Sequence, residues 1–255
     1  MELEGKIALV TGSSQGIGQA IAARLAKEGA NIIIDYRSHS EGAEQTRSLV
    51  EAAGANAAVV KADLSSVEQI GYLIESGVKA FGGIDILVNN AGIEKRKDFW
   101  EVTEEEYDAV MAVNLKGVFF TTQGFVRKLQ STGRRGKVIN ISSVHEELPF
   151  PHFTSYCMSK GGMKMMTRNL AIELAPFGIT VNSVAPGAIE TPINKALLQD
   201  QEKLHALLAN IPLQRLGQPR DVADVVAFLA SAGADYITGT TVFVDGGLLW
   251  NYQEQ

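Results

Sequence analysis

The sequence predicts an α/β protein, a doubly wound parallel sheet of seven strands within a single domain of the Rossmann type. Two observations lead to this prediction. Seven short apolar runs alternate with longer amphipathic segments along the 255 residues, which is the pattern of repeated strand–helix units. A glycine-rich segment, TGSSQGIG at residues 11–18, joins the first apolar run to the first amphipathic segment, where a doubly wound fold carries a ligand-binding turn.

The predicted strands are residues 7–10, 32–34, 57–60, 86–88, 138–141, 180–184 and 241–244. These runs are apolar on both faces, as strands are when helices cover both sides of a parallel sheet. The predicted helices are residues 18–28, 41–53, 67–81, 104–129, 155–175 and 219–230. Residues 191–210 carry leucines at helical spacing but fit no strand–helix repeat. They are expected to form either a lid-like insertion over the functional site or an additional packing helix.

The composition, with 45% hydrophobic and 20% charged residues, excludes disordered and collagen-like proteins. The formal net charge of −6 argues against a nucleic-acid-binding face. The lone cysteine, Cys157, indicates a reducing compartment, and no apolar run approaches the roughly 20 residues that span a membrane. The N-terminal residues are acidic rather than signal-like, so a cytoplasmic protein is expected. The four histidines show no metal-ligand spacing, and no metal site is expected.

The glycine-rich segment is predicted to bind a pyrophosphate. Glycines permit a tight turn and a close backbone approach, and the start of the following helix offers free N–H groups. The residues expected to contact the cofactor here are Gly12, Ser14, Gln15, Gly16, Ile17 and Gly18. The neighbouring Ser13 supplies another hydroxyl.

The end of the second strand is expected to select between the two nicotinamide dinucleotides. An acid facing the ribose favours NAD, whereas an arginine favours the 2′-phosphate of NADP. Asp35 and Arg37 supply both types, and Arg37 lies better placed just beyond the strand, flanked by Tyr36 and Ser38. NADP is therefore predicted as the preferred cofactor, with NAD tolerated. Asp63 is interpreted either as an acceptor for the adenine amino group or as the N-cap of the next helix.

Four positions further along the chain carry the predicted chemistry. Tyr156 and Lys160 are spaced i, i+4, so both side chains lie on one face of a helix. The ammonium of Lys160 is expected to lower the pKa of the phenol and so permit proton exchange with a substrate hydroxyl. Ser143 follows the fifth strand, and Asn114 stands within a predicted helix, where asparagine is unfavourable unless its side chain has a function.

Together with the Asn-Asn-Ala-Gly segment at residues 89–92, these motifs resemble the short-chain dehydrogenase/reductase family over essentially the full chain. The resemblance implies that Tyr156 is the catalytic acid/base, that Lys160 also binds the nicotinamide ribose, and that Ser143 fixes the reacting oxygen. Asn114 would hold a water that links Lys160 to solvent. A homotetramer is implied as well. The further cofactor contacts that the resemblance implies are Leu64, Asn90, Ala91, Gly92, Pro186, Gly187, Ile189 and Thr191.

Several segments are similar to the glucose 1-dehydrogenase group of that family, including SSVHE at residues 142–146 and GAIETPIN at residues 187–194. This similarity implies oxidation of D-glucose to gluconolactone. Glu94, His145, Ser143 and Tyr156 are expected to contact the substrate, because a polyol needs many hydrogen-bond partners. Glu146 is left open between a substrate contact and a structural role.

Two other functions stay open. The rim LPFPHF at residues 148–153 suits a bulkier, less polar carbonyl, as in an NADPH-dependent reductase of 3-oxoacyl thioesters or related compounds. A catalytically silent NADP(H) sensor is the second alternative.

Overall fold

The predicted parallel sheet is confirmed by the computed structural model, which describes residues 1–192 and 200–251. Seven parallel strands follow the order β3-β2-β1-β4-β5-β6-β7. The strands are β1 Ile7–Val10, β2 Asn31–Tyr36, β3 Ala57–Lys61, β4 Ile86–Asn89, β5 Gly136–Ile141, β6 Ile179–Pro186 and β7 Thr241–Val244. Each prediction overlaps its strand, and β2 and β6 differ most because each begins one residue earlier and ends two residues later than predicted.

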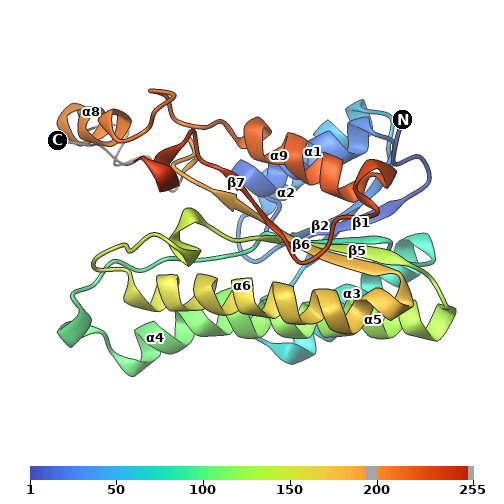
Figure 1. Cartoon of the computed structure of the whole chain (residues 1–255). Coiled ribbons are helices and arrows are strands. Elements are labelled where there is room, and N and C mark those ends of the chain that lie inside the picture. The colour runs from blue at the N-terminus through green and yellow to red at the C-terminus, as the bar shows by residue number, and fades with distance from the viewer. Residues whose placement is uncertain (193–199, 252–255) are drawn as a thin grey trace.

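Helices cover both faces of the sheet (Figure 1). One layer holds α1 Gly16–Lys27, α2 Ser40–Ala52 and α9 Pro219–Ala230. The other holds α3 Val67–Phe81, α4 Glu104–Met111, α5 Val118–Thr132 and α6 Thr154–Leu174. Two hydrophobic cores result, one between each layer and the sheet. Alternate residues of one strand enter opposite cores, since Ala8 and Val10 pack in the first and Leu9 in the second. This explains why the strands are apolar on both faces.

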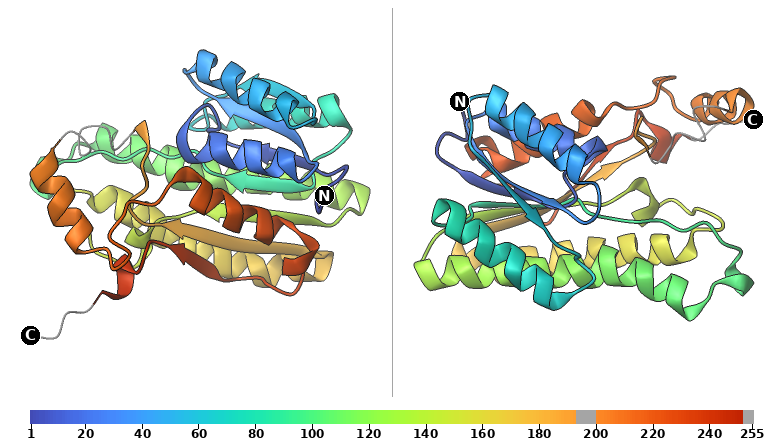
Figure 2. Two further views of the ribbon diagram at one scale, coloured as in Figure 1. Left: turned by 90° about the horizontal axis from the view of Figure 1, so that it is seen from above. Right: turned by 180° about the vertical axis from the view of Figure 1, so that it is seen from behind.

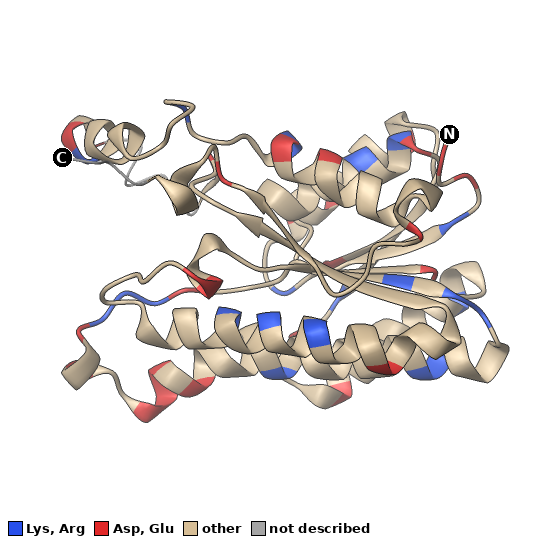
Figure 3. Ribbon diagram, viewed as in Figure 1, with Lys and Arg blue, Asp and Glu red and all other residues tan. Residues whose placement is uncertain are grey.

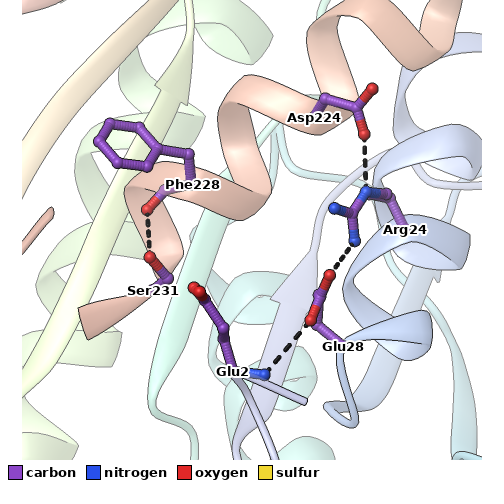
Figure 4. A network of polar contacts seen from close by, with 6 residues as sticks. All are labelled: Glu2, Arg24, Glu28, Asp224, Phe228 and Ser231. Atoms are coloured by element: carbon purple, nitrogen blue, oxygen red, sulfur yellow. Dashed lines mark hydrogen bonds and ion pairs between the residues drawn. The ribbon is translucent and has the colours of Figure 1, made fainter. Parts of the chain in front are cut away.

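The N-terminal helix is joined to the C-terminal helix α9 by a polar network (Figure 4). Arg24 on α1 pairs with Asp224 on α9 and with Glu28, at 2.6 Å in both cases. The Glu28 carboxylate also accepts a hydrogen bond from the backbone N–H of Glu2. Exposed ion pairs of this kind contribute little individually, so the apolar contact of α1 with α9 holds these helices together. The remaining charges of both signs are interspersed over both layers (Figure 3).

The single helix predicted at 104–129 is interrupted in the structure. α4 ends at Met111, a π-helical turn runs over Ala112–Gly117, and α5 starts at Val118. Asn114 lies inside this turn, and Gly117 packs so closely that a Cβ there would stand 2.7 Å from the carbonyl oxygen of Leu64. π-Helical turns of this kind are frequent at functional sites. Helical periodicity does not reveal one extra residue in a turn, so the sequence pattern missed it.

The predicted insertion at 191–210 contributes α8, Gln201–Ala209, which projects from one end of the molecule (Figures 1 and 2). None of its residues is buried. Residues 193–199, with Leu197 among them, lie outside the described residues. No helix within residues 1–192 and 200–251 is both long and apolar enough to cross a membrane.

Candidate active site

A cavity of about 1080 Å³ opens at the carboxyl edge of the sheet. It lies between the ends of the neighbouring strands β1 and β4. From β1 the chain builds one half of the sheet, β2 and β3, and from β4 it builds the other half, β5 to β7. Doubly wound folds bind their ligands at this point. Two predicted site residues, Tyr36 and Asn114, do not line it. The predicted residues that do are Gly12, Ser14, Gln15, Gly16, Ile17, Gly18, Arg37, Ser38, Asp63, Leu64, Asn90, Ala91, Gly92, Glu94, Ser143, His145, Tyr156, Lys160, Pro186, Gly187, Ile189 and Thr191.

The glycine-rich turn forms a cradle at one end of this cavity. Gly12 and Gly16 both have φ +59°, a conformation that favours glycine. A Cβ on Gly18 would stand 2.4 Å from Asn90 Nδ2 and 2.6 Å from the carbonyl oxygen of Gly12. Gln15 precedes α1 without a side-chain cap, so the first N–H groups of that helix stay available to an anion. The turn is shaped for close approach of a phosphate.

Asp35 lies beneath this turn and was not predicted to contact it. The carboxylate Oδ2 accepts a hydrogen bond from the N–H of Gly12 at 2.9 Å, while Oδ1 is buried and finds no partner among the described residues. Burial raises the pKa of Asp35 to about 7, against which the Gly12 hydrogen bond acts. Ser13 also turns inward, because its hydroxyl donates to the carbonyl of Val10. The hydroxyl of Ser13 therefore does not supply the expected phosphate contact.

Replacing Asp35 with asparagine is expected to stabilise the protein above neutral pH. The raised pKa means that the folded state binds this proton more tightly than the unfolded chain. The proton on Asp35 contributes its full stabilisation of the folded state below pH ~4, and this contribution is lost as the pH rises through about 7. At pH ~8 the variant should gain on the order of 3 kcal/mol in the free energy of unfolding. Urea denaturation at pH ~5 and ~8 measures this, and an equal difference at both values would contradict it.

The ribose-selecting region differs from the prediction at Tyr36, which packs against the hydrophobic core beneath the sheet edge. Arg37 is exposed and lines the cavity, and its guanidinium is close enough to Asp63 to lower the pKa of that carboxyl. Asp63 is not the N-cap of α3, a place that Ser66 takes. Its carboxylate instead accepts hydrogen bonds from the N–H and hydroxyl of Ser65 at 2.9 and 2.8 Å. Although burial opposes it, these bonds and the Arg37 guanidinium lower the pKa of Asp63.

The segment after β4 packs directly on the glycine-rich turn. Asn90 Nδ2 donates to the carbonyls of Thr11 and Gly12, at 2.9 and 3.1 Å. A Cβ on Gly12 would stand 2.9 Å from the Cα of Ala91. The two loops therefore hold each other at a fixed distance and leave one continuous wall for a bound dinucleotide.

The predicted reacting groups converge at the middle of the cavity. Ser143 and Tyr156 both line it, and the Ser143 hydroxyl is close enough to the Tyr156 hydroxyl to lower the pKa of the phenol. Lys160 is only 4% exposed; its Nζ donates to the carbonyl of Ile141 at 2.8 Å and lies 5.5 Å from the centre of the Tyr156 ring. This arrangement places a proton-carrying phenol, a hydroxyl and a cation around one point on the cavity wall.

The expected depression of the phenol pKa is wrong. Burial raises the pKa of Tyr156 to about 12, and the Glu94 carboxylate raises it further, while the neighbouring Ser143 hydroxyl lowers it. The reason is positional, since the Lys160 ammonium lies over the ring rather than beside the hydroxyl. Burial also lowers the pKa of Lys160 to about 8. At neutral pH Tyr156 thus holds its proton and can donate it.

Asn114 lies behind the cavity wall and is fully buried. Its Nδ2 donates to the carbonyl of Ile93 at 2.8 Å and to Ser159 Oγ at 3.2 Å, and its Oδ1 accepts from the N–H of Ile93 at 2.8 Å. The π-helical turn thereby fixes the loop that carries Glu94. Asn114 therefore positions its neighbours in the cavity wall.

Beyond the reacting groups the cavity wall is largely aromatic and apolar. His145, Phe150 and Phe153 form a stack with ring centroids 4.2 and 4.1 Å apart. Burial lowers the pKa of His145, and its Nδ1 lies 3.0 Å from the carbonyl of Leu148. The neutral ring therefore donates from Nδ1 and leaves Nε2 as an acceptor. Glu94 also lines the cavity and is exposed, and partial burial of its carboxyl raises its pKa.

The far part of the cavity is lined by segments far apart in the chain that meet only through the fold. Leu148, Pro149 and Phe150 belong to the predicted rim. Leu248 and Asn251 were not selected from the sequence, because no local motif identifies them. The predicted insertion at 191–210 thus reaches the cavity through Thr191, Pro192, Leu207 and Asn210.

The last group of predicted cofactor contacts begins at the end of β6. The N–H of Gly187 donates to the carbonyl of Val244 at 3.0 Å, and a Cβ there would stand 2.9 Å from the Cα of Asp245. The close approach of these two segments requires glycine. With the glycine-rich turn at one end and this turn at the other, the residues present fit an extended dinucleotide such as NAD(P). Within the described ranges no cluster of three metal-ligating side chains occurs.

Comparison with known proteins agrees with this geometry. A family model described as enoyl-(acyl carrier protein) reductase matches residues 12–249. The 3β-hydroxysteroid dehydrogenase 1 of Eggerthella lenta is 46% identical over 247 residues, covering 97% of this chain and 95% of the relative. The glucose 1-dehydrogenase of Gluconobacter oxydans is 41% identical over 244 residues, covering 96% and 92%.

A solved structure with bound NADP is also similar. It is a protein from Agrobacterium tumefaciens provisionally assigned as a 2-deoxy-D-gluconate 3-dehydrogenase, with a TM-score of 0.92 and 41% identity over 98% of both chains. The fold, the cavity at the switch point and these matches agree, and the chain belongs to the short-chain dehydrogenase/reductase family of oxidoreductases.

Proposed function

We propose that this protein is an NAD(P)-dependent dehydrogenase that oxidises a secondary or anomeric alcohol carried on a ring, and that reduces the corresponding carbonyl. The observation that carries the proposal is the convergence of Ser143, Tyr156 and Lys160 on the wall of one cavity that also has a glycine cradle, with Lys160 Nζ 5.5 Å from the centre of the Tyr156 ring. When bound, the nicotinamide supplies the hydride acceptor or donor.

The residues of the chain handle the proton and the orientation. Ser143 donates to the substrate oxygen and fixes its place beside Tyr156. In reduction, the Tyr156 hydroxyl gives its proton to that oxygen as the carbon receives the hydride, and in oxidation the same phenol takes the proton back. Lys160 contributes positive charge near the ribose and the phenol. Asn114 is a positioning residue, and the water relay implied by the resemblance remains part of the proposal.

NADP is proposed as the preferred cofactor, with NAD also accepted. Arg37 is exposed at the cavity edge, where its guanidinium can pair with a 2′-phosphate. Replacing Arg37 with alanine should raise the KM for NADP about ten- to hundredfold and leave that for NAD within about twofold. Arg47→Ala is the matched control, because this arginine pairs with Glu44 on α2 away from the cavity. Equal KM ratios in the parent and the Arg37 variant would refute this role.

D-Glucose, oxidised at C1 to the lactone, is the substrate that we propose first. Glu94 and His145, whose Nε2 is an acceptor, line the same cavity as the reacting groups, and they suit a ring that carries several hydroxyls. The name of the 41% identical relative supports the same class.

An apolar ring alcohol is the second candidate, favoured by the His145, Phe150 and Phe153 stack and by Leu148, Leu207 and Leu248 on the cavity wall. The 46% identical relative is named as acting on a hydroxysteroid. NADPH absorbance with glucose, 3β-hydroxysteroids and 3-oxoacyl thioesters, followed in both directions, tests the proposal. Turnover of glucose alone supports the first candidate, and turnover of none of them points to an NADP(H) sensor.

A homotetramer is proposed as well, with α5 and α6 between the subunits as the family resemblance implies. Phe119 on α5 and Met158, Met165 and Ile172 on α6 are all exposed, and burying them would remove apolar surface from water. Light scattering coupled to size-exclusion chromatography measures the mass, and a monomer at micromolar concentration would contradict the proposal.

A further inference from the structure

Glu146 is a buried acid next to the reacting groups that does not line the cavity. It ends the short 3₁₀ helix Val144–Glu146 and is 9% exposed. Its Oε2 accepts a hydrogen bond from Ser142 Oγ at 2.5 Å. Its Oε1 is buried, and no hydrogen-bond partner for it is present among the described residues. A buried carboxylate with one free oxygen is costly, so a nearby positive charge is expected.

Lys160 is the positive charge in question. Its ammonium is buried, its one hydrogen bond goes to the carbonyl of Ile141, and within the described residues it forms no ion pair at 4.0 Å or less. Burial alone favours the neutral amine. A lysine that must stay charged in such a place needs compensating negative charge.

The backbone brings the two groups together. Ile141 accepts the hydrogen bond of Lys160, and the next residue, Ser142, holds Glu146. The 3₁₀ helix with Glu146 also packs against α6, which carries Lys160. The charged groups that face Lys160 are Glu146 and Glu94, both of which raise its pKa, and the phenol of Tyr156 covers another side. Glu94 stands on the cavity wall, whereas Glu146 acts from behind it.

We propose that Glu146 is a positioning residue whose carboxylate, held by Ser142, keeps the ammonium of Lys160 charged from the protein side of the active site. This inference rests on the proposed function of Lys160. The sequence left the role of Glu146 open between a substrate contact and a structural role, and the inference assigns it the second kind. The carboxylate stays in place whatever substrate enters, so its effect on Lys160 is independent of the bound molecule.

Glu146→Gln tests the proposal, because glutamine keeps the shape and an oxygen for Ser142 while removing the charge. Loss of that charge lowers the pKa of Lys160. The alkaline limb of kcat/KM for carbonyl reduction should therefore move about one pH unit downward, a roughly tenfold loss at a pH on that limb. Glu147→Gln is the matched control, since Glu147 is exposed and pairs with Lys164 at the surface. Its profile should match that of the parent.

A second readout separates this inference from the proposed reaction. NADPH binding, followed by fluorescence between pH ~6 and ~9, reports the charge of Lys160 even when no substrate turns over. The midpoint of the binding profile should move to lower pH in Glu146→Gln and, to a smaller extent, in Ser142→Ala. The Ser142→Ala variant serves as the test if the glutamine variant does not fold. A folded Glu146→Gln protein with an unshifted binding profile would overturn the inference. So would an equal shift in Glu147→Gln, because it would show a general charge effect.

Discussion

Replacing Tyr156 with phenylalanine is expected to lower kcat by about 10²- to 10⁴-fold in both directions, the contribution of a positioned general acid or base. The variant loses only the hydroxyl that faces the cavity beside Ser143. The ring stays beneath the Lys160 ammonium, so the dissociation constant for NADPH should change by less than about threefold. Steady-state kinetics and a fluorescence titration of NADPH measure the two quantities.

Tyr72→Phe is the matched control for this substitution. Tyr72 is 62% exposed on α3 and does not line the cavity, so loss of its hydroxyl should leave kcat unchanged. An undiminished kcat in Tyr156→Phe would show that another group carries the proton. A loss confined to NADPH binding would show that Tyr156 serves only to hold the cofactor.

Gly18→Ala is expected to have the second large effect, on both stability and cofactor binding. The new methyl group would stand 2.4 Å from Asn90 Nδ2 and 2.6 Å from the carbonyl oxygen of Gly12. One of these neighbours is backbone in the glycine-rich turn, so the turn must shift. Overpacking of this kind costs about 1–3 kcal/mol. Because the turn forms the cradle, NADPH affinity should fall at least about tenfold.

Gly71→Ala in α3 provides the comparison, since a Cβ there meets no atom within 4 Å. Alanine is the better helix former, and that variant should gain up to about 1 kcal/mol with unchanged NADPH affinity. Urea denaturation and NADPH titration of both variants distinguish a local clash from a general effect of glycine replacement. A Gly18→Ala protein as stable and as NADPH-competent as the parent would refute the packing described for the cradle.

Local patterns in the sequence were sufficient for the sheet and for the glycine-rich turn, and the family resemblance supplied many of the other predicted residues that line the cavity. A strand covered on both faces must be apolar throughout, and a turn that approaches backbone must be glycine, so both leave a visible pattern. The break in the helix at Asn114 leaves none, because an extra residue in a π-helical turn alters no side-chain type. The rim residues Leu207 and Leu248 meet only through the fold.

Electrostatic properties were the hardest to predict. The spacing of Tyr156 and Lys160 correctly placed both on one helix face. The predicted direction of the phenol pKa was wrong because burial raises that pKa and the ammonium lies over the ring rather than beside the hydroxyl. Likewise, the sequence could not show that Asp35 turns under the glycine-rich turn or that Glu146 turns away from the cavity. Burial depends on the whole fold, and a side chain's depth cannot be read from its neighbours in the chain.

Transfer of deuterium from a labelled alcohol to the nicotinamide tests the proposed reaction most directly. The protein is incubated with NADP and with glucose or a hydroxysteroid that carries deuterium on the carbinol carbon, and the NADPH formed is analysed by mass spectrometry. Deuterated NADPH should form with the parent protein and, over the same time, be absent with Tyr156→Phe. Tight NADPH binding without label transfer from any alcohol, and without carbonyl reduction in the reverse assay, would contradict the assignment of an active dehydrogenase.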